Sequence, residues 1–143
     1  MGQYDEILTS FKEFKYFTLA NTNPSQRLFN GCRSLRDIDL SNVTKLSSWE
    51  FSGTNLSGYT GSNIEGDINI PNLSEIGEQA FGSSKIKTIS NLGNITAISR
   101  YCFRDCSELT SAVIPTTVTS IGLYAFSARN TSYTKVFMSI IGL

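Results

Sequence analysis

The chain has 143 residues, which is enough for one domain with a sizeable core. Its 12 Lys and Arg residues balance its 12 Asp and Glu residues, so there is no basic excess to bind nucleic acid or an anionic membrane. The chain has no histidine, which removes the commonest general base, the commonest metal ligand and every Ser-His or Cys-His pair. We therefore expect no enzyme, no cofactor and no metal.

Residues 1–28 are predicted to form an N-terminal cap. Tyr4, Ile7, Leu8, Phe11 and Phe14 recur at the spacing of an amphipathic helix, which would cover the apolar end of whatever follows. A helix that binds a partner is the alternative. The first residues contain no secretory signal, and no apolar run is long enough to span a membrane.

The rest of the chain consists of repeat units, each of which we name by the phenylalanine that begins it: Phe29, Phe51, Phe81, Phe103 and Phe126. Apolar residues follow each phenylalanine in an L-x-x-L-x-L pattern, which points side chains inward around a short strand. One unit cannot bury its own apolar face, so the units must stack with their strands about 4.8 Å apart. We predict a solenoid of about five 22- to 23-residue coils over residues 29–143, with a short parallel sheet on one face.

The predicted core consists of the apolar residues that the units share. They are Leu35, Ile38, Leu40, Val43 and Leu46; Leu56, Ile68, Ile70, Leu73 and Ile76; Ile86, Ile89, Leu92, Ile95 and Ile98; Leu109, Ala112, Ile114, Val118 and Ile121. The Phe51 unit is longer than the others, and residues 57–66 are expected to form an inserted loop. Tyr59 in this loop is a candidate contact residue, although neutral variation in loop length is the alternative.

Three stretches, residues 28–41, 80–84 and 103–126, resemble BspA-type leucine-rich repeats. They read Leu-Phe-Asn-Gly-Cys-Arg-Ser-Leu-Arg-Asp-Ile-Asp-Leu-Ser, Ala-Phe-Gly-Ser-Ser and Phe-Arg-Asp-Cys-Ser-Glu-Leu-Thr-Ser-Ala-Val-Ile-Pro-Thr-Thr-Val-Thr-Ser-Ile-Gly-Leu-Tyr-Ala-Phe. The resemblance implies an adhesion or binding protein of bacteria, protists or phages, without catalytic activity, at the cell surface or outside the cell. Its expected ligand is a protein or a glycan. A structural component of a larger assembly, such as a phage virion, is the alternative.

Strand alternation predicts two columns of outward side chains on the sheet face. The first column is Asp37, Asp67, Thr88, Ser111 and Lys135, and the second is Asp39, Asn69, Ser90, Val113 and Phe137. The face thus changes from acidic to hydroxyl-bearing to apolar, which suits recognition of an extended partner. These residues and Tyr59 are the candidate binding residues.

The three acids of these columns leave several interpretations open. Asp37, Asp39 and Asp67 could form a weak calcium site, because calcium takes carboxylate oxygens. Adjacent acids could also form a glycosidase pair. We favour the third interpretation, in which the acids are solvated and keep the face soluble.

Two further residue types recur within the repeats. Cys32 and Cys106 both lie three residues after a phenylalanine, and the predicted stacking places them too far apart to bond to each other. We favour buried thiols that pack as small apolar side chains, for Cys102 as well. Asn42, Asn72 and Asn94 also share one offset, and they are predicted to be turn residues that bond to the backbone.

The C-terminal segment from Val136 onward is a nearly uncharged strand. The spacing of Tyr133, Val136 and Met138 matches that of Leu109, Ala112 and Ile114, so a fifth unit is expected to begin here. An open edge strand recruits another strand. Either the chain self-associates through this strand or further repeats cover it; the alternative is that residues 140–143 fold back and close the last unit.

Overall fold

The computed structural model describes residues 10–11, 29, 35–48, 51, 64–127 and 137–140. In these ranges the regular elements are ten short strands. They are β1 (Ser10–Phe11), β2 (Asp37–Ile38), β3 (Lys45–Leu46), β4 (Glu65–Asn69), β5 (Glu75–Ile76), β6 (Lys85–Asn91), β7 (Ala97–Ile98), β8 (Ser111–Ile114), β9 (Ser120–Ile121) and β10 (Phe137–Ile140). The described part of the chain holds no helix that could cross a membrane.

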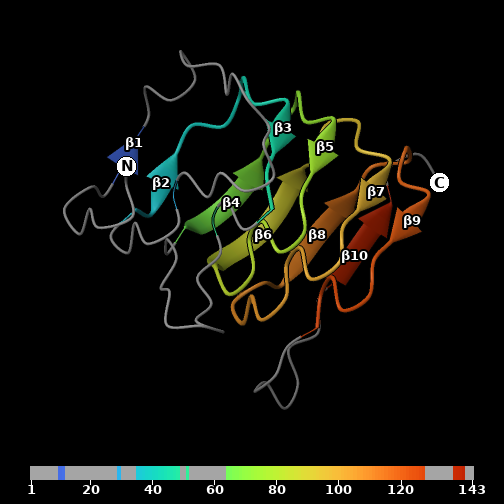
Figure 1. Ribbon diagram of the computed structural model, residues 1–143. Coiled ribbons are helices and arrows are strands. Elements are labelled where there is room, and N and C mark those ends of the chain that lie inside the picture. Colours follow the sequence, from blue (N-terminus) through green and yellow to red (C-terminus); the bar gives the residue numbers. More distant parts are fainter. Residues whose placement is uncertain are drawn as a thin grey trace.

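The strands pair in parallel, and Figure 1 shows them in two rows. One row contains a four-stranded sheet in the order β10-β8-β6-β4, with the separate pair β1-β2 beyond β4. The other row contains the pairs β3-β5 and β7-β9. The repeats that begin at Phe29, Phe51, Phe81 and Phe103 each contribute one strand to each row, and the Phe126 repeat contributes β10 to the first row. All of the described pairings are parallel. These short parallel sheets fit a repeat solenoid.

The predicted core residues lie between the two rows. Of those that the structure describes, all are buried except three: Ile38 and Val118 are partly buried, and Ile121 is 51% exposed. The exposed Ile121 lies in β9, the last strand of its row, where no further described strand covers it. The prediction of the core is therefore confirmed in the interior of the stack and wrong at its end.

The phenylalanines that begin the repeats form one continuous stack of rings. Neighbouring ring centroids lie 5.1 to 5.7 Å apart, and the planes differ by 4° to 14°, from Phe29 through Phe51, Phe81 and Phe103 to Phe126. The rings of Phe51 and Phe81 are completely buried. The inner rings, Phe51, Phe81 and Phe103, are therefore covered on both faces by the repeats before and after them, which single repeats could not achieve.

In the Phe81 and Phe103 repeats, a buried donor three residues after the phenylalanine bonds to the repeat before. The hydroxyl of Ser84 donates to the carbonyl oxygen of Phe51 at 3.0 Å, and the thiol of Cys106 donates to that of Phe81 at 3.1 Å. Serine and cysteine can therefore occupy the same buried position in these two repeats, because either supplies a small side chain with one donor. Cys32 has the same offset in its repeat, but it lies outside the described residues.

The corners beside the phenylalanines have left-handed backbone conformations. The φ angles are 54°, 59° and 58° at Gln79, Tyr101 and Tyr124, two residues before a phenylalanine, and 56° and 58° at Ser83 and Asp105, two residues after one. Residues other than glycine rarely adopt such φ angles. Backbone bonds between repeats hold these corners; the amide of Tyr101, for example, donates to the carbonyl of Leu123 at 3.1 Å.

The helix prediction for the N-terminal cap is wrong at Ser10 and Phe11, the two residues of that segment that the structure describes. They form β1, which pairs in parallel with β2 and places Phe11 opposite Ile38. In sequence, Leu8 precedes Phe11 by three residues, as Leu35 precedes Ile38, so one apolar spacing fits either a helix or a repeat strand. Pairing with β2 favours the strand. The remainder of residues 1–28 lies outside the described residues, so the boundary of the cap stays a prediction.

The register of the last strand differs from the predicted one by two residues. Met138, rather than Val136, lies opposite Ala112. Phe137 therefore takes a position in the first column, opposite Ser111, and Ser139 takes the position in the second column that the sequence assigned to Phe137. Side chains alternate between the two faces of a strand, so a shift of two residues leaves the apolar side chains on the same face. The apolar pattern therefore does not distinguish the predicted register from the observed one.

The pairing of β4 with β6 is irregular. The seven residues of β6 run beside the five of β4, with register shifts after Gly66 and after Ile68, so Asn69 lies opposite Asn91 and not opposite Ser90 as predicted. Strand β4 also begins at Glu65, inside the range expected for the inserted loop. The buried Ile64 immediately before it supplies a core side chain that the repeat pattern assigned to the loop.

Replacing Phe81 with alanine should lower the free energy of unfolding by about 3–5 kcal/mol, because it removes a fully buried ring from the middle of the stack. The matched variant Phe126→Ala should cost less, since Phe126 is only partly buried. Urea unfolding followed by circular dichroism measures both values. Equal losses at the two positions would contradict a continuous stack that is weakest at its end.

Replacing Cys106 with serine should change the free energy of unfolding by less than about 1 kcal/mol, because Ser84 already fills the equivalent position with a hydroxyl. Replacing it with alanine removes the donor and leaves a small gap, so we expect a loss of about 1–2 kcal/mol. The same urea titration checks both variants. A serine variant less stable than the alanine variant would show that the donor has no role.

Candidate functional site

The sheet face is interrupted between the Phe29 and Phe51 repeats. Strand β2 pairs with β1, whereas β4 pairs with β6, so the predicted single sheet is divided between β2 and β4. The amide of Glu65 donates to the carbonyl of Arg36 at 3.1 Å, and the two side chains form an ion pair at 3.8 Å. These contacts join the two repeats at one end of the interruption.

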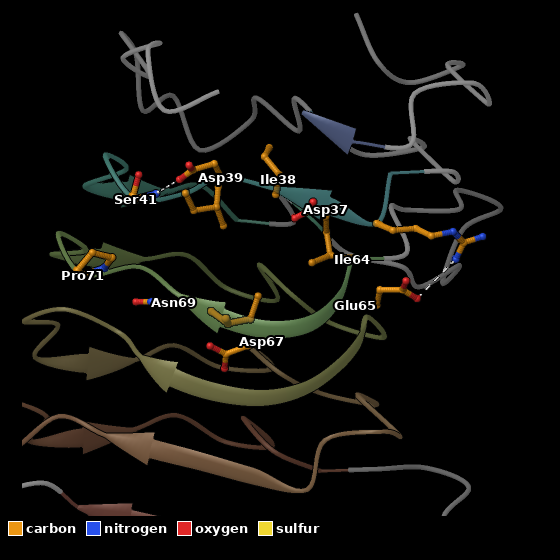
Figure 2. A pocket seen from close by; sticks show the side chains of 12 residues that line it. Asp37, Ile38, Asp39, Ser41, Ile64, Glu65, Asp67, Asn69 and Pro71 are labelled. Atoms are coloured by element: carbon orange, nitrogen blue, oxygen red, sulfur yellow. Dashed lines mark hydrogen bonds and ion pairs between the residues drawn. The ribbon is translucent and has the colours of Figure 1, made fainter. Parts of the chain in front are cut away.

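A cavity of about 250 Å³ opens where the sheet is interrupted, and we call it the notch. Figure 2 shows it between β2 with its following turn on one side and β4 on the other. Its lining residues are Arg36, Asp37, Ile38, Asp39, Leu40, Ser41, Ile64, Glu65, Asp67, Ile68, Asn69 and Pro71. Four of the candidate binding residues, Asp37, Asp39, Asp67 and Asn69, therefore come together around one cavity.

The notch combines an apolar lining with acidic groups. Ile64, Ile68 and Leu40 are buried, and Ile38 is partly buried. Four of the lining side chains are carboxylates and one is a guanidinium, and that guanidinium is already paired with Glu65. A ligand with an apolar body and a positive charge matches both properties.

Asp39 has a structural role as well as a charge. One of its carboxylate oxygens accepts the amide hydrogen of Ser41 at 2.9 Å, which closes the turn after β2. Asn91 makes the same bond to the amide of Gly93 at 2.9 Å, at the end of β6. An asparagine side chain can therefore accept the same bond from the amide two residues on, so the bond itself does not need the negative charge at position 39.

Asp67 is bonded to the neighbouring strand. Its carboxylate accepts the hydroxyl of Thr88 at 2.7 Å and the hydroxyl of Ser90 at 2.5 Å. Figure 2 shows the carboxylate pointing away from β2, toward β6. The predicted columns thus contain a cross-strand network in which Asp67 organises two hydroxyl groups.

The orientation of the Asp67 carboxylate can be compared with two interpretations of the acids, a calcium site and a glycosidase pair. Within the described residues, no group of three carboxylates or thiols is arranged to hold a metal ion, so the calcium interpretation has no support there. A glycosidase pair would need carboxyl groups that face each other across a cleft. Asp67 faces β6 instead of facing Asp37, which does not match that arrangement.

The other candidate residues lie apart from the notch. Ser111 and Val113 are half-buried in β8, two strands from β4. Phe137 lies in β10 at the outer edge of the sheet. Tyr59 and Lys135 lie outside the described residues, so their roles stay predictions.

The asparagine prediction is confirmed at Asn72. The side-chain amide of Asn72 donates to the carbonyl of Ser41 at 2.7 Å, and so binds the backbone of the preceding repeat. This bond lies next to the notch, because Ser41 and Pro71 both line it. It fixes the two turns relative to each other.

Sequence reasoning missed Arg36, Glu65 and Ile64 as notch residues. Arg36 lies one residue before Asp37, and Glu65 lies two residues before Asp67. Their opposite charges were a signal that the two strands meet. Ile64 was assigned to the insertion because it does not fit the three-residue spacing. The sequence does not show that the sheet is interrupted between β2 and β4, and the notch lies at this interruption.

The two described cysteines do not offer a nucleophile. Cys102 and Cys106 are buried free thiols, as predicted. Burial raises the pKa of Cys102 well above its usual value and raises the pKa of Cys106 to about 12. Both thiols therefore stay protonated at neutral pH, which fits a packing role.

The family model of the BspA type leucine-rich repeat region matches residues 7–64 and 59–141, in six copies. Searches of the curated proteins and of the solved structures found no match. The matched ranges include the notch and both rows of strands.

The stability of the protein should fall at alkaline pH in part through Cys106. In the unfolded chain this thiol ionises near its ordinary pKa of 9.0, whereas in the folded chain burial holds the pKa at about 12. Between these two values the unfolded state has lost a proton that the folded state keeps, so the free energy of unfolding decreases as the pH rises. Urea titrations at about pH 8 and about pH 11 should show that the free energy of unfolding decreases less for Cys106→Ser than for the unmodified chain. An identical decrease would contradict burial of this thiol.

Proposed function

The chain belongs to the family of BspA-type leucine-rich repeats, and on that premise we propose that it is a non-enzymatic module that binds a protein at a cell or host surface. Repeats of this family suggest protein binding or adhesion. The partner would lie on the sheet face, with the notch as its anchor point. The notch is the observation that carries the proposal.

A lysine or arginine side chain is the group that the notch fits best. Such a side chain has an aliphatic stem that can contact Ile38 and Ile68, and a cationic head that can reach the carboxylates of Asp37 and Asp39. A volume of about 250 Å³ is at the small end for ligand sites, so it suits one side chain better than a whole ligand. The partner is therefore expected to present a basic residue within a longer contact.

The rest of the sheet face offers a continuation for such a partner. Thr88 and Ser90 present hydroxyl groups beside the notch, and Ser111 and Val113 follow on β8. An extended segment that crosses the strands would pass from acidic to polar to less polar surface. This order gives the partner a direction, because its basic residue must lie at the β4 end.

A protein fits the notch better than a glycan does. None of the described residues that line the notch is aromatic, so this part of the lining offers no aromatic face on which a sugar ring could stack. The lining instead pairs isoleucine and leucine with carboxylates, which is the complement of a basic amphipathic side chain.

Peptides selected from a random display library against this protein should be enriched in Lys or Arg at one position. Against the best of them, the double variant Asp37→Asn/Asp39→Asn should bind about two- to thirtyfold more weakly, because each exposed ion pair is worth about 0.2–1 kcal/mol. Calorimetric titration measures the two affinities. The double variant should fold, since an asparagine at position 39 can accept the same bond, as Asn91 does.

Glu108→Gln is the matched control, because it removes one exposed acid that does not line the notch. Its affinity for the same peptide should equal that of the unmodified chain. Selected peptides without a common basic residue, or an equal loss in the control, would contradict the role of the notch. Binding to a glycan array with no selected peptide at all would contradict the protein partner.

A further inference from the structure

Asp67, Thr88 and Ser90 form one cluster on the sheet face beside the notch, which we call the acceptor array. One carboxylate oxygen of Asp67 accepts the hydroxyl of Thr88 at 2.7 Å, and the other accepts the hydroxyl of Ser90 at 2.5 Å. Asp67 and Ser90 are exposed, and Thr88 is partly exposed. The array lies on β4 and β6, between β2 and β8 in Figure 1, and so away from both ends of the described strands.

The bonds to Asp67 fix the polarity of both hydroxyl groups. A hydroxyl has one proton, whereas an ionised carboxylate has none and can only accept. The protons of Thr88 and Ser90 must therefore point at Asp67, so the two hydroxyl oxygens can offer only lone pairs to a ligand. The Ser90 hydroxyl also lies 3.4 Å from the carbonyl oxygen of Ile68, which is a further acceptor. The side chains of the array thus present acceptors and no free donor.

The charge of Asp67 is not neutralised by a neighbouring cation. Three other exposed acids are paired across the repeats, Glu65 with Arg36, Glu75 with Lys45 and Glu78 with Arg100. Among the described residues, no lysine or arginine forms such a pair with Asp67. The array is therefore an anionic surface whose counter-charge a ligand can supply.

We propose that the acceptor array binds the guanidinium group of an arginine in the partner. A guanidinium carries a positive charge and five N–H donors in one plane, so it can bond to the carboxylate and to a hydroxyl oxygen at the same time. An ammonium group is a compact charge that holds its water more strongly and has fewer donors. The array therefore selects arginine over lysine, whereas the notch accepts either.

The array and the notch are two separate sites for one partner. The notch opens between β2 and β4, whereas the Asp67 carboxylate points to the other side of β4, toward β6 (Figure 2). The proposal rests on the proposed function, because the same segment would carry a basic residue for the notch and an arginine for the array. Each site can be altered without the other, so the two ideas can fail separately.

Selection of peptides from a random display library against three forms of the full chain tests the proposal. The array variant, Thr88→Val/Ser90→Ala, removes both hydroxyl oxygens and keeps the carboxylate of Asp67. The notch variant is Asp37→Asn/Asp39→Asn. The unmodified chain should select peptides that contain an arginine at a second position, in addition to the basic residue for the notch. The array variant should lose the enrichment of this arginine alone, and the notch variant that of the other residue alone.

Calorimetric titration of the best peptide measures the preference for arginine. Replacing the second-position arginine with lysine, or with the uncharged analogue citrulline, should weaken binding to the unmodified chain about two- to tenfold for each hydrogen bond lost. On the array variant, the arginine and lysine peptides should bind equally well. Circular dichroism and the urea midpoint check that the variant is folded.

Ser74→Ala/Thr119→Val is the matched control. It also removes two exposed hydroxyl groups that donate across repeats, but these lie beside β5 and β9 in the other row, and both donate to backbone carbonyls. The control should keep the full preference for arginine. Asp67→Asn is a second variant of the array, because an asparagine amide donates to one hydroxyl and turns the proton of that hydroxyl outward. It should also lower the ratio of arginine to lysine affinity.

The possible outcomes separate this proposal from the proposed function. An arginine preference that is absent from the unmodified chain, or that survives in the array variant and in Asp67→Asn, would overturn the array and leave the notch unaffected. Enrichment of the array arginine without any basic residue that depends on Asp37 and Asp39 would support the array and overturn the notch. A library that contains no binding peptide would overturn both.

Discussion

Contact between successive repeats is the constraint on which the whole structure depends. A repeat of about 22 residues has one apolar face and two short strands, neither of which is stable alone. Three kinds of contact join the Phe51, Phe81 and Phe103 repeats: parallel strand pairs, stacked phenylalanines and the bond from a buried hydroxyl or thiol to a phenylalanine carbonyl. Among the described strands, the pairing is interrupted between β2 and β4, where the notch opens, and between β5 and β7.

The sequence predicts the interior of the stack well because each interior residue obeys a local rule. The described apolar positions between Leu35 and Ile114 are buried or partly buried where the repeat pattern places them. The errors lie where a choice depends on another part of the chain. The register of β10 depends on loop length, the bulges of β6 depend on β4, and β1 is a strand because β2 lies beside it.

Four residues of the notch, Asp37, Asp39, Asp67 and Asn69, were among the predicted binding residues, but the shape of the site was not predicted. Strand alternation placed Asp37 and Asp67 in one outward column, yet it implied a continuous sheet between them. The interruption turns that column into a cavity, and hydroxyl groups on β6 turn Asp67 away from it. Local propensity contains no information about such a gap, which arises from the way two unequal repeats meet.

The interchange of Ser84 and Cys106 has a consequence for how proteins of this kind change in length. The Phe81 and Phe103 repeats receive the same ring stacking and the same buried donor bond from their predecessors, so duplication or loss of one such unit keeps these contacts intact. The Phe51 repeat is the exception, because it alone provides β4 and one wall of the notch. Evolution can therefore lengthen or shorten the stack elsewhere, whereas gain or loss of this unit would change what the protein recognises.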